Sequence, residues 1–213
     1  MKRRWTMGLA LLLVAIGWAQ AAGFSVRGAL RYDGGGFGAE GEAGFGQKLS
    51  PQLEVGAKLS LRAIPFSDPL ILIVPNAFAE YRSSLAEGVQ GVGRAELGLG
   101  ILPQLFPRVY LSGGVDARYK LADLDVFGQA RLNFDFIPTN RATPSLSGRF
   151  GAILIPFVPY AGGELGYNLV SAASSLNVFV GSLLYLSPQF FVGLEGGFNN
   201  GGYLRLVAEF DER

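Results

Sequence analysis

Residues 109–121 read VYLSGGVDARYKL, and this stretch decides the fold class of the chain. Apart from one glycine, every second residue is apolar or aromatic, and most residues between them are polar or charged. Successive side chains of an extended strand point to opposite faces, so a period of two predicts a β-strand with one apolar and one polar face. The apolar face carries Val109, Leu111, Val115, Ala117, Tyr119 and Leu121, and the polar face carries Tyr110, Ser112, Asp116, Arg118 and Lys120.

The same alternation recurs through the rest of the chain. Most segments are close to the 9 to 11 or so residues that a tilted membrane strand needs, and Gly-, Pro- and Asp-rich turns separate them. We therefore predict an all-β, antiparallel, up-and-down transmembrane β-barrel of about 12 strands, with 10 or 8 as alternatives. Segments 73–82 and 176–186 fit the pattern least well. The predicted strands cover residues 23–32, 37–49, 53–63, 73–82, 91–101, 109–121, 126–136, 146–154, 158–168, 176–186, 190–198 and 203–210.

The first 21 residues have the pattern of a secretory signal peptide. A basic stretch, Lys2 to Arg4, precedes an apolar run over residues 7–18, and Ala19-Gln20-Ala21 follows as a cleavage pattern. The apolar run is shorter than the roughly 18 residues of a membrane-spanning helix. We predict a signal peptide over residues 1–21 and one exported barrel domain over residues 22–213.

Composition excludes several classes of protein. The chain has no His and no Cys, so it holds no Ser-His-Asp triad, no thiolate nucleophile and no imidazole or thiolate zinc site. Its 18 Lys and Arg are balanced by 17 Asp and Glu, which leaves no broad basic surface for a phosphate backbone. We expect no enzymatic activity, no cofactor, no bound metal and no nucleic-acid partner.

The charged residues of the predicted strands fall on the polar face. Glu40 and Glu42 share a face and resemble an acid/base pair, but an ion-pair ladder with Lys58, Arg62 and Arg27 is the simpler interpretation. Glycine is also frequent on the polar face, where we expect it to leave room for long Arg and Glu side chains. The charged residues expected to face the lumen are Arg27, Arg31, Glu40, Glu42, Glu54, Lys58, Arg62, Arg94, Glu96, Asp116, Arg118, Lys120, Arg131, Asp135, Glu164, Glu195 and Arg205.

Alternation by itself leaves two orientations open. In a transmembrane barrel the apolar face meets lipid and the polar face lines the lumen, whereas in a soluble lipocalin-like barrel the apolar face points inward. Aromatic residues near the strand ends favour the membrane orientation, because they form the girdles of transmembrane barrels. These residues are Phe24, Tyr32, Phe37, Tyr81, Tyr119, Phe134, Phe136, Tyr167, Phe198 and Phe210.

Two stretches resemble small bacterial outer-membrane barrels. Residues 159–167, PYAGGELGY, are similar to the P-Y-x-G-x-x-x-G-Y strand of outer-membrane protein A-like and opacity-like barrels. The last strand alternates Leu204, Leu206, Ala208 and Phe210, and resembles the C-terminal aromatic signal that such proteins present to the barrel-assembly machinery. The resemblance implies an outer-membrane location, with outer-membrane lipid and the assembly machinery as partners.

Two functions remain for such a barrel. The first is an integral outer-membrane protein that acts as a structural scaffold or as a narrow, non-specific diffusion channel, porin-like, with a charge-balanced lumen. Ion pairs that join Arg94, Arg118 and Arg131 to Glu96, Asp116 and Asp135 are expected to constrict that lumen. The alternative is a soluble periplasmic barrel that binds a hydrophobic ligand.

Overall fold

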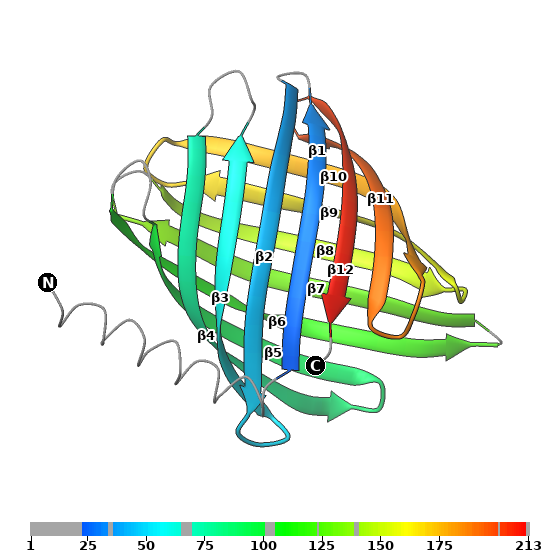
Figure 1. Cartoon of the computed structure of the whole chain (residues 1–213). Helices are drawn as coiled ribbons and strands as arrows, with labels where there is room; N and C mark the ends of the chain where they lie inside the picture. The colour runs from blue at the N-terminus through cyan, green and yellow to red at the C-terminus, as the bar shows by residue number, and fades with distance from the viewer. Residues whose placement is uncertain are drawn as a thin grey trace, which may run out of the picture.

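The chain forms one closed barrel of twelve antiparallel strands (Figure 1). The computed structural model describes residues 23–33, 36–64, 70–100, 105–122, 124–138, 141–199 and 201–211, and the predicted signal peptide lies outside these ranges. Each strand pairs with its neighbours in the chain, and β1 pairs with β12, so the predicted 12-stranded up-and-down barrel is confirmed. The strands are β1 (Gly23–Asp33), β2 (Gly36–Lys48), β3 (Leu53–Ile64), β4 (Leu70–Ala86), β5 (Val89–Gly100), β6 (Phe106–Leu121), β7 (Leu124–Ile137), β8 (Arg141–Ile153), β9 (Phe157–Asn168), β10 (Ala173–Tyr185), β11 (Phe190–Asn199) and β12 (Gly202–Asp211).

The pairing register keeps one face of every strand turned inward. Arg27 on β1, for example, lies opposite Glu209 on β12 and Glu42 on β2, so all three side chains share the inner face. A slip of one residue would turn a whole set of charged side chains outward. Closure between β1 and β12 pairs the two edge strands, as a bilayer requires because it offers no water to unpaired backbone groups.

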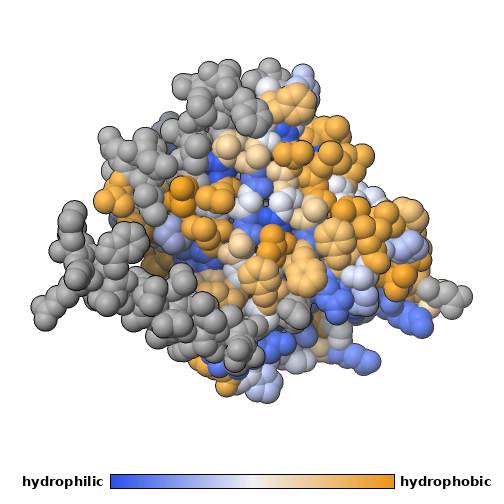
Figure 2. Space-filling model, viewed as in Figure 1, coloured by the Kyte–Doolittle hydropathy of each residue, from blue (hydrophilic) through white to orange (hydrophobic). Residues whose placement is uncertain are grey.

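The outer face of the barrel is apolar. Leu97, Leu132 and Phe150 are 66%, 64% and 67% exposed, and Figure 2 shows apolar side chains spread over the visible outer face. On the described strands, no outward position carries Asp, Glu, Lys or Arg. The soluble barrel with an apolar interior is therefore wrong, because the apolar residues are on the outside and the charged residues are on the inside.

Aromatic residues flank this outer surface near both ends of the strands. At the β1–β2 end, the rings of Tyr32 and Phe37 are in contact, with 4.8 Å between their centroids. Tyr119, Phe198 and Phe210 face outward close to the ends of β6, β11 and β12. This is the arrangement of an interfacial girdle, where an amphipathic ring meets both lipid and headgroups.

The largest extensions beyond the predicted strands are in β4 and β8. Segment 73–82 is part of β4, which covers residues 70–86, and segment 146–154 is part of β8, which starts at Arg141 within a predicted turn. Pro75 and Pro144 lie inside these strands although proline removes a ladder donor. Both face outward. The strand continues past Pro75 by pairing with β3 alone and past Pro144 by pairing with β7 alone, because pairing with the other neighbour begins only at Asn76 and Ser145.

A glycine, Gly88, lies in the turn between β4 and β5. Gly88 has a φ of +71°, a left-handed conformation that costs glycine little because it has no Cβ. Its carbonyl accepts a hydrogen bond from the Arg118 backbone N–H at 2.7 Å, which ties this turn to β6. None of the described residues forms a helix long and apolar enough to cross a membrane.

Candidate functional site

The inner face of the barrel is the candidate site, since it gathers the charged residues. By register, all seventeen charged residues singled out from the sequence lie on inward positions. Two of them, Arg118 and Lys120, are near the end of β6 and are largely exposed. The strands that carry these residues are β1 (Arg27, Arg31), β2 (Glu40, Glu42), β3 (Glu54, Lys58, Arg62), β5 (Arg94, Glu96), β6 (Asp116, Arg118, Lys120), β7 (Arg131, Asp135), β9 (Glu164), β11 (Glu195) and β12 (Arg205).

One cluster of alternating charges runs along the wall from β2 to β5. We call it the charge ladder, and it consists of Glu42, Lys58, Glu96, Arg94, Glu80 and Arg82. Lys58 Nζ lies 3.2 Å from Glu42 Oε2 and 2.9 Å from Glu96 Oε1. Arg94 continues the ladder, with Nε 2.7 Å from Glu96 Oε1 and Nη1 3.0 Å from Glu80 Oε2. Arg82 Nη2 ends it 2.6 Å from Glu80 Oε1.

Lys58 on β3 reaches Glu96 on β5 across β4. The inward positions beside this path hold a glycine and an asparagine that is hydrogen-bonded to the backbone. In the register, Lys58 on β3 lies opposite Asn76 on β4, and Asn76 lies opposite Gly98 on β5. The Asn76 amide donates to the Val74 carbonyl at 2.8 Å and stays against the wall. The ladder therefore joins next-but-one strands, an arrangement that strand-by-strand reading of the sequence does not show.

A second cluster lies on β6 to β9 and centres on Asn133. Tyr110 and Ser112 donate hydroxyl hydrogen bonds to Asn133 Oδ1 at 3.0 and 2.9 Å, and Asn133 Nδ2 donates to Ser145 and Ser147. Ser145 in turn donates to Glu164 Oε1 at 2.6 Å. Because each of these buried polar groups has a partner, this part of the wall is held in one arrangement.

The ion pairs predicted from sequence are found in part. Arg94 pairs with Glu96, and Arg131 pairs with Asp116. Asp135 and Arg118, which belong to the same predicted set, have other partners. Asp135 accepts from Arg108 at 2.7 Å and from Arg141 at 3.1 Å, and Arg118 lies 3.6 Å from Asp125.

Near Glu40, two arginines share one carboxylate. Arg62 Nε lies 3.4 Å from Glu40 Oε1, and Arg205 Nη2 lies 2.8 Å from Glu40 Oε2. Arg205 on β12 crosses β1 to make this contact with β2, where the direct β1 partner of Glu40 is the small Ala29. Arg27 pairs instead with Glu209 at 3.6 Å. Glu40 and Glu42 are thus ion-pair partners rather than an acid/base pair.

A different kind of wall extends from β8 to β1, and we call it the tyrosine wall: Arg149, Tyr160, Glu195, Tyr203 and Arg31. Tyr160 and Tyr203 donate their hydroxyl hydrogens to the two oxygens of Glu195 at 3.0 and 3.1 Å. A guanidinium covers each ring. That of Arg149 is 3.7 Å from the centroid of Tyr160, and that of Arg31 is 4.3 Å from the centroid of Tyr203.

Inward glycines make room for aromatic rings, and not mainly for the long charged side chains that the sequence suggested. A Cβ on Gly181 would lie 2.6 Å from the ring of Tyr160, which is its direct partner on the neighbouring strand. The same relation recurs around the barrel, where a glycine opposite a ring leaves the space that a side chain would fill. These cross-strand pairs are Gly56 with Phe78, Gly100 with Phe106, Gly151 with Phe127, Gly162 with Phe179, Gly181 with Tyr160 and Gly197 with Tyr203.

Sequence reasoning missed several residues that build the site. Asn133, Tyr160 and Tyr203 are uncharged, so a census of charged residues passes over them. Arg108 lies one residue before the predicted start of its strand, and β6 in fact begins at Phe106. The available signal was the parity of each strand, since all four residues fall on the polar side of the alternation.

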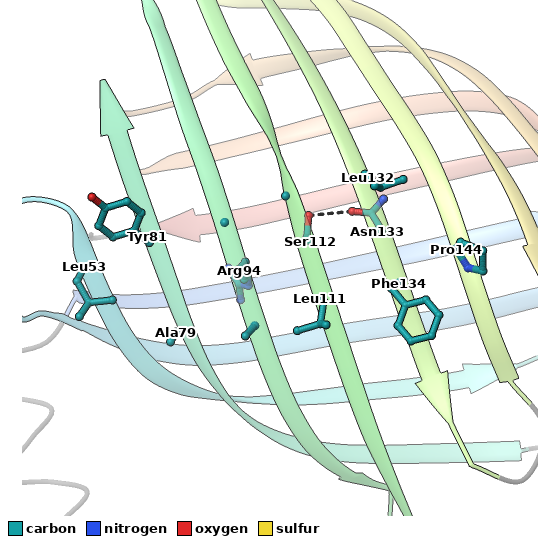
Figure 3. A pocket seen from close by; sticks show the side chains of 13 residues that line it. Leu53, Ala79, Tyr81, Arg94, Leu111, Ser112, Leu132, Asn133, Phe134 and Pro144 are labelled. Carbon is teal, nitrogen blue, oxygen red and sulfur yellow. Dashed lines mark hydrogen bonds between the residues drawn. The ribbon is translucent and has the colours of Figure 1, made fainter. Parts of the chain in front are cut away.

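Several concave apolar sites lie on the outside of the barrel. Figure 3 shows one of them, with Leu53, Tyr81, Leu132 and Phe134 among its lining side chains. Gly93 and Gly113 also line it, and a Cβ at either position would meet no atom within 4 Å. The hydrogen bond between Ser112 and Asn133 belongs to the lumen side of the same wall. Within the described ranges, no three His, Cys, Asp or Glu residues lie close enough to hold a metal ion.

Solved structures of outer-membrane barrels match the chain over most of both lengths. The KdgM porin matches with a TM-score of 0.61 at 13% identity, covering 87% of this chain and 98% of that one. An outer membrane channel from Pseudomonas putida F1 matches with a TM-score of 0.61 at 12% identity, covering 90% and 95%. The NanC porin matches with a TM-score of 0.60 at 9% identity, covering 88% and 98%.

The fold is that of outer-membrane porins and channels. No protein-family model matches the sequence, and no curated protein is similar to it. The likeness is therefore one of architecture.

Proposed function

We propose that the protein is an integral outer-membrane channel that gives small hydrophilic solutes a narrow, weakly selective path. The observation that carries the proposal is the course of the ion pairs. Each pair described above joins residues of one strand, of neighbouring strands or of next-but-one strands, so the side chains lie along the wall instead of crossing the lumen. A twelve-stranded barrel is wider than the eight-stranded kind that side chains just fill.

Weak selectivity follows from the balance of charge. The seventeen inward residues predicted from sequence comprise nine basic and eight acidic side chains. Most of the basic ones hold a carboxylate within 4 Å, as in the charge ladder, so the wall presents little net field to a passing ion. We expect cations and anions to permeate at similar rates.

A polyanionic substrate has less support. The KdgM porin has been solved in complex with disordered oligogalacturonate, which is a polyanion. In this chain a polyanion would have to compete with Glu40, Glu42, Glu96 and Asp135 for the arginines and the lysine that they already hold. We therefore propose small solutes rather than acidic chains.

The absence of catalysis is also a proposal. The chain has neither His nor Cys, and its inward carboxylates are engaged with cations or hydroxyls. The LpxR protein of Salmonella typhimurium shares the fold at 7% identity, which carries no residue role to this chain. Kinship with the outer-membrane protein A-like and opacity-like families rests on residues 159–167 and on the alternating pattern of the last strand.

Two partners complete the proposal. Outer-membrane lipid would cover the uncharged outer face, since a Lys or Arg on that face near the bilayer midplane would cost about 2–4 kcal/mol. The barrel-assembly machinery would recognise β12, where Leu204, Leu206 and Phe210 face outward. The strand continues one residue further, with Asp211 opposite Ser25.

Reconstitution into planar bilayers tests the channel. We expect small stepwise conductances with a cation-to-anion permeability ratio near one. Bilayers that stay silent, although an unheated gel shows the compact barrel, would overturn the channel and leave the structural scaffold. Recovery of a folded monomer from an aqueous extract without detergent would overturn the membrane location as well.

A further inference from the structure

One inward cation stands apart from the others. The guanidinium of Arg149 on β8 lies over the ring of Tyr160 at 3.7 Å and 5.8 Å from the centroid of Phe127. Among the described residues it forms no ion pair and no hydrogen bond, and its Nε is buried without an acceptor. Lys48 and Lys120, which also have no ion pair within the described ranges, are exposed near the ends of their strands.

The ring against which Arg149 lies is fixed by its own contacts. Tyr160 is buried, lies flat on Gly181 and donates to Glu195, so its ring presents one fixed face to the lumen. Glu195 is occupied by Tyr160, Tyr203 and, at 4.0 Å, by Arg205. A partly buried guanidinium without a counter-ion is costly, and an anion from the solution would supply that counter-ion.

The surface beside Tyr160 is apolar. The next inward row runs through Val158 on β9, Leu183 on β10, Gly193 on β11 and Val207 on β12, which are direct cross-strand partners. We call Val158, Leu183 and Val207 the apolar strip. The strip begins at Val158, two residues from Tyr160 on β9, and Phe127 lies beside Arg149 on the other neighbouring strand. The chemistry offered is therefore a guanidinium without a counter-ion among the described residues, with apolar side chains close to it.

We propose that Arg149 and the apolar strip form a binding site for small carboxylates that carry a flat apolar body, such as aromatic carboxylates. The planar donor fork of a guanidinium matches the two oxygens of a carboxylate, and the ring of the solute would lie against Phe127 and the Val158 end of the strip. The inference rests on the proposed channel for its physiological use, but binding itself needs only the folded barrel. A single unpaired guanidinium suits one carboxylate rather than a chain of them.

Benzoate binding to the protein, purified from membranes in detergent, is measured by isothermal titration calorimetry. Block of the single-channel current is a second measure of the same binding. We expect benzoate to bind and to shorten the open times of the channel. Cyclohexanecarboxylate should bind more weakly and shorten the open times less. In Arg149→Gln the benzoate dissociation constant rises at least about tenfold, as the loss of a charged hydrogen-bond pair implies. Arg149→Lys, which keeps the charge without the fork, gives an intermediate loss.

Arg108→Gln is the matched control, because it removes an inward arginine whose partner Asp135 is still held by Arg141. Its benzoate affinity stays within about twofold of the unsubstituted protein. Equal affinity in Arg149→Gln, or an equal loss in Arg108→Gln, would overturn the site, and so would binding of chloride or oligogalacturonate with the same dependence on Arg149. Silent bilayers combined with benzoate binding would defeat the channel and keep the site, whereas conductance without benzoate binding would do the reverse.

Discussion

The charge ladder and the tyrosine wall solve the same problem in different ways. In the ladder, each inner carboxylate is shared by two cations, and long flexible side chains bridge three strands. In the tyrosine wall, one carboxylate is shared by two rigid phenols that lie on glycines. The ladder neutralises its own cations, whereas the tyrosine wall uses its carboxylate on hydroxyls and leaves a guanidinium free to bind. The difference locates solute recognition on the tyrosine wall and electrostatic cohesion on the ladder.

The largest effect is expected from removing the central charge of the ladder. Glu96 is 5% exposed and holds both Lys58 and Arg94, so Glu96→Gln leaves two partly buried cations with one carboxylate partner each. We expect the free energy of unfolding to fall by about 3 kcal/mol, near the lower end of the range for a broken buried ion pair. The folded fraction on unheated gels across a urea series in lipid vesicles measures it.

Arg82→Gln is the control for that variant. The Arg82 side chain is 54% exposed, and an exposed ion pair contributes less than about 1 kcal/mol. Equal losses for the two variants would show that the ladder has no buried centre and would remove the contrast with the tyrosine wall.

An intermediate effect is expected where a ring lies on a glycine. Gly181→Val places a side chain against the ring of Tyr160 and the Leu194 carbonyl, 2.6 and 2.8 Å from the new Cβ. Overpacking of this kind costs about 1–3 kcal/mol, and the displaced ring also weakens the benzoate affinity. Urea titration and calorimetry on the same sample measure both consequences.

Gly113→Val provides the comparison, since a Cβ there meets nothing within 4 Å and points outward. Valine suits a strand better than glycine, so we expect stability to stay equal or to rise by up to about 1 kcal/mol. An equal loss of stability in both variants would mean that Gly181 is needed for its backbone conformation and not for the space that it leaves for the ring of Tyr160.

The smallest effect is expected from deleting one hydroxyl of the tyrosine wall. Tyr160→Phe removes one of the two donors to Glu195, while Tyr203 and Arg205 remain, so the loss is about 1 kcal/mol. Tyr81→Phe, at an outward and 54% exposed position, stays within about 0.5 kcal/mol. If Tyr160→Phe were silent in the urea series, Glu195 would not be what holds the ring in place.

Particular elements show how far the sequence predicts the structure. Segment 176–186 has Phe179 and Leu183 on its nominally polar face, yet β10 exists as a strand and turns both residues inward. Phe179 lies on Gly162 and Leu183 approaches Gly193, so the lumen includes apolar surface that a rule of polar interiors does not anticipate. Among the ion pairs, those between direct neighbours, such as Arg131 with Asp116, were open to prediction, whereas Lys58 with Glu96 was not.

The sequence alone was enough to predict the antiparallel order of the strands and which residues face inward, whereas it left their number at about 12 with 10 or 8 as alternatives. The reason is local: side chains alternate every residue, and a charge is tolerated on one side only. Tertiary structure decided which inward residues meet, because the stagger of twelve strands sets the cross-strand partners. That stagger laid Tyr160 on Gly181 and carried Lys58 across β4 to Glu96, and it left Arg149 beside two rings with no carboxylate of its own.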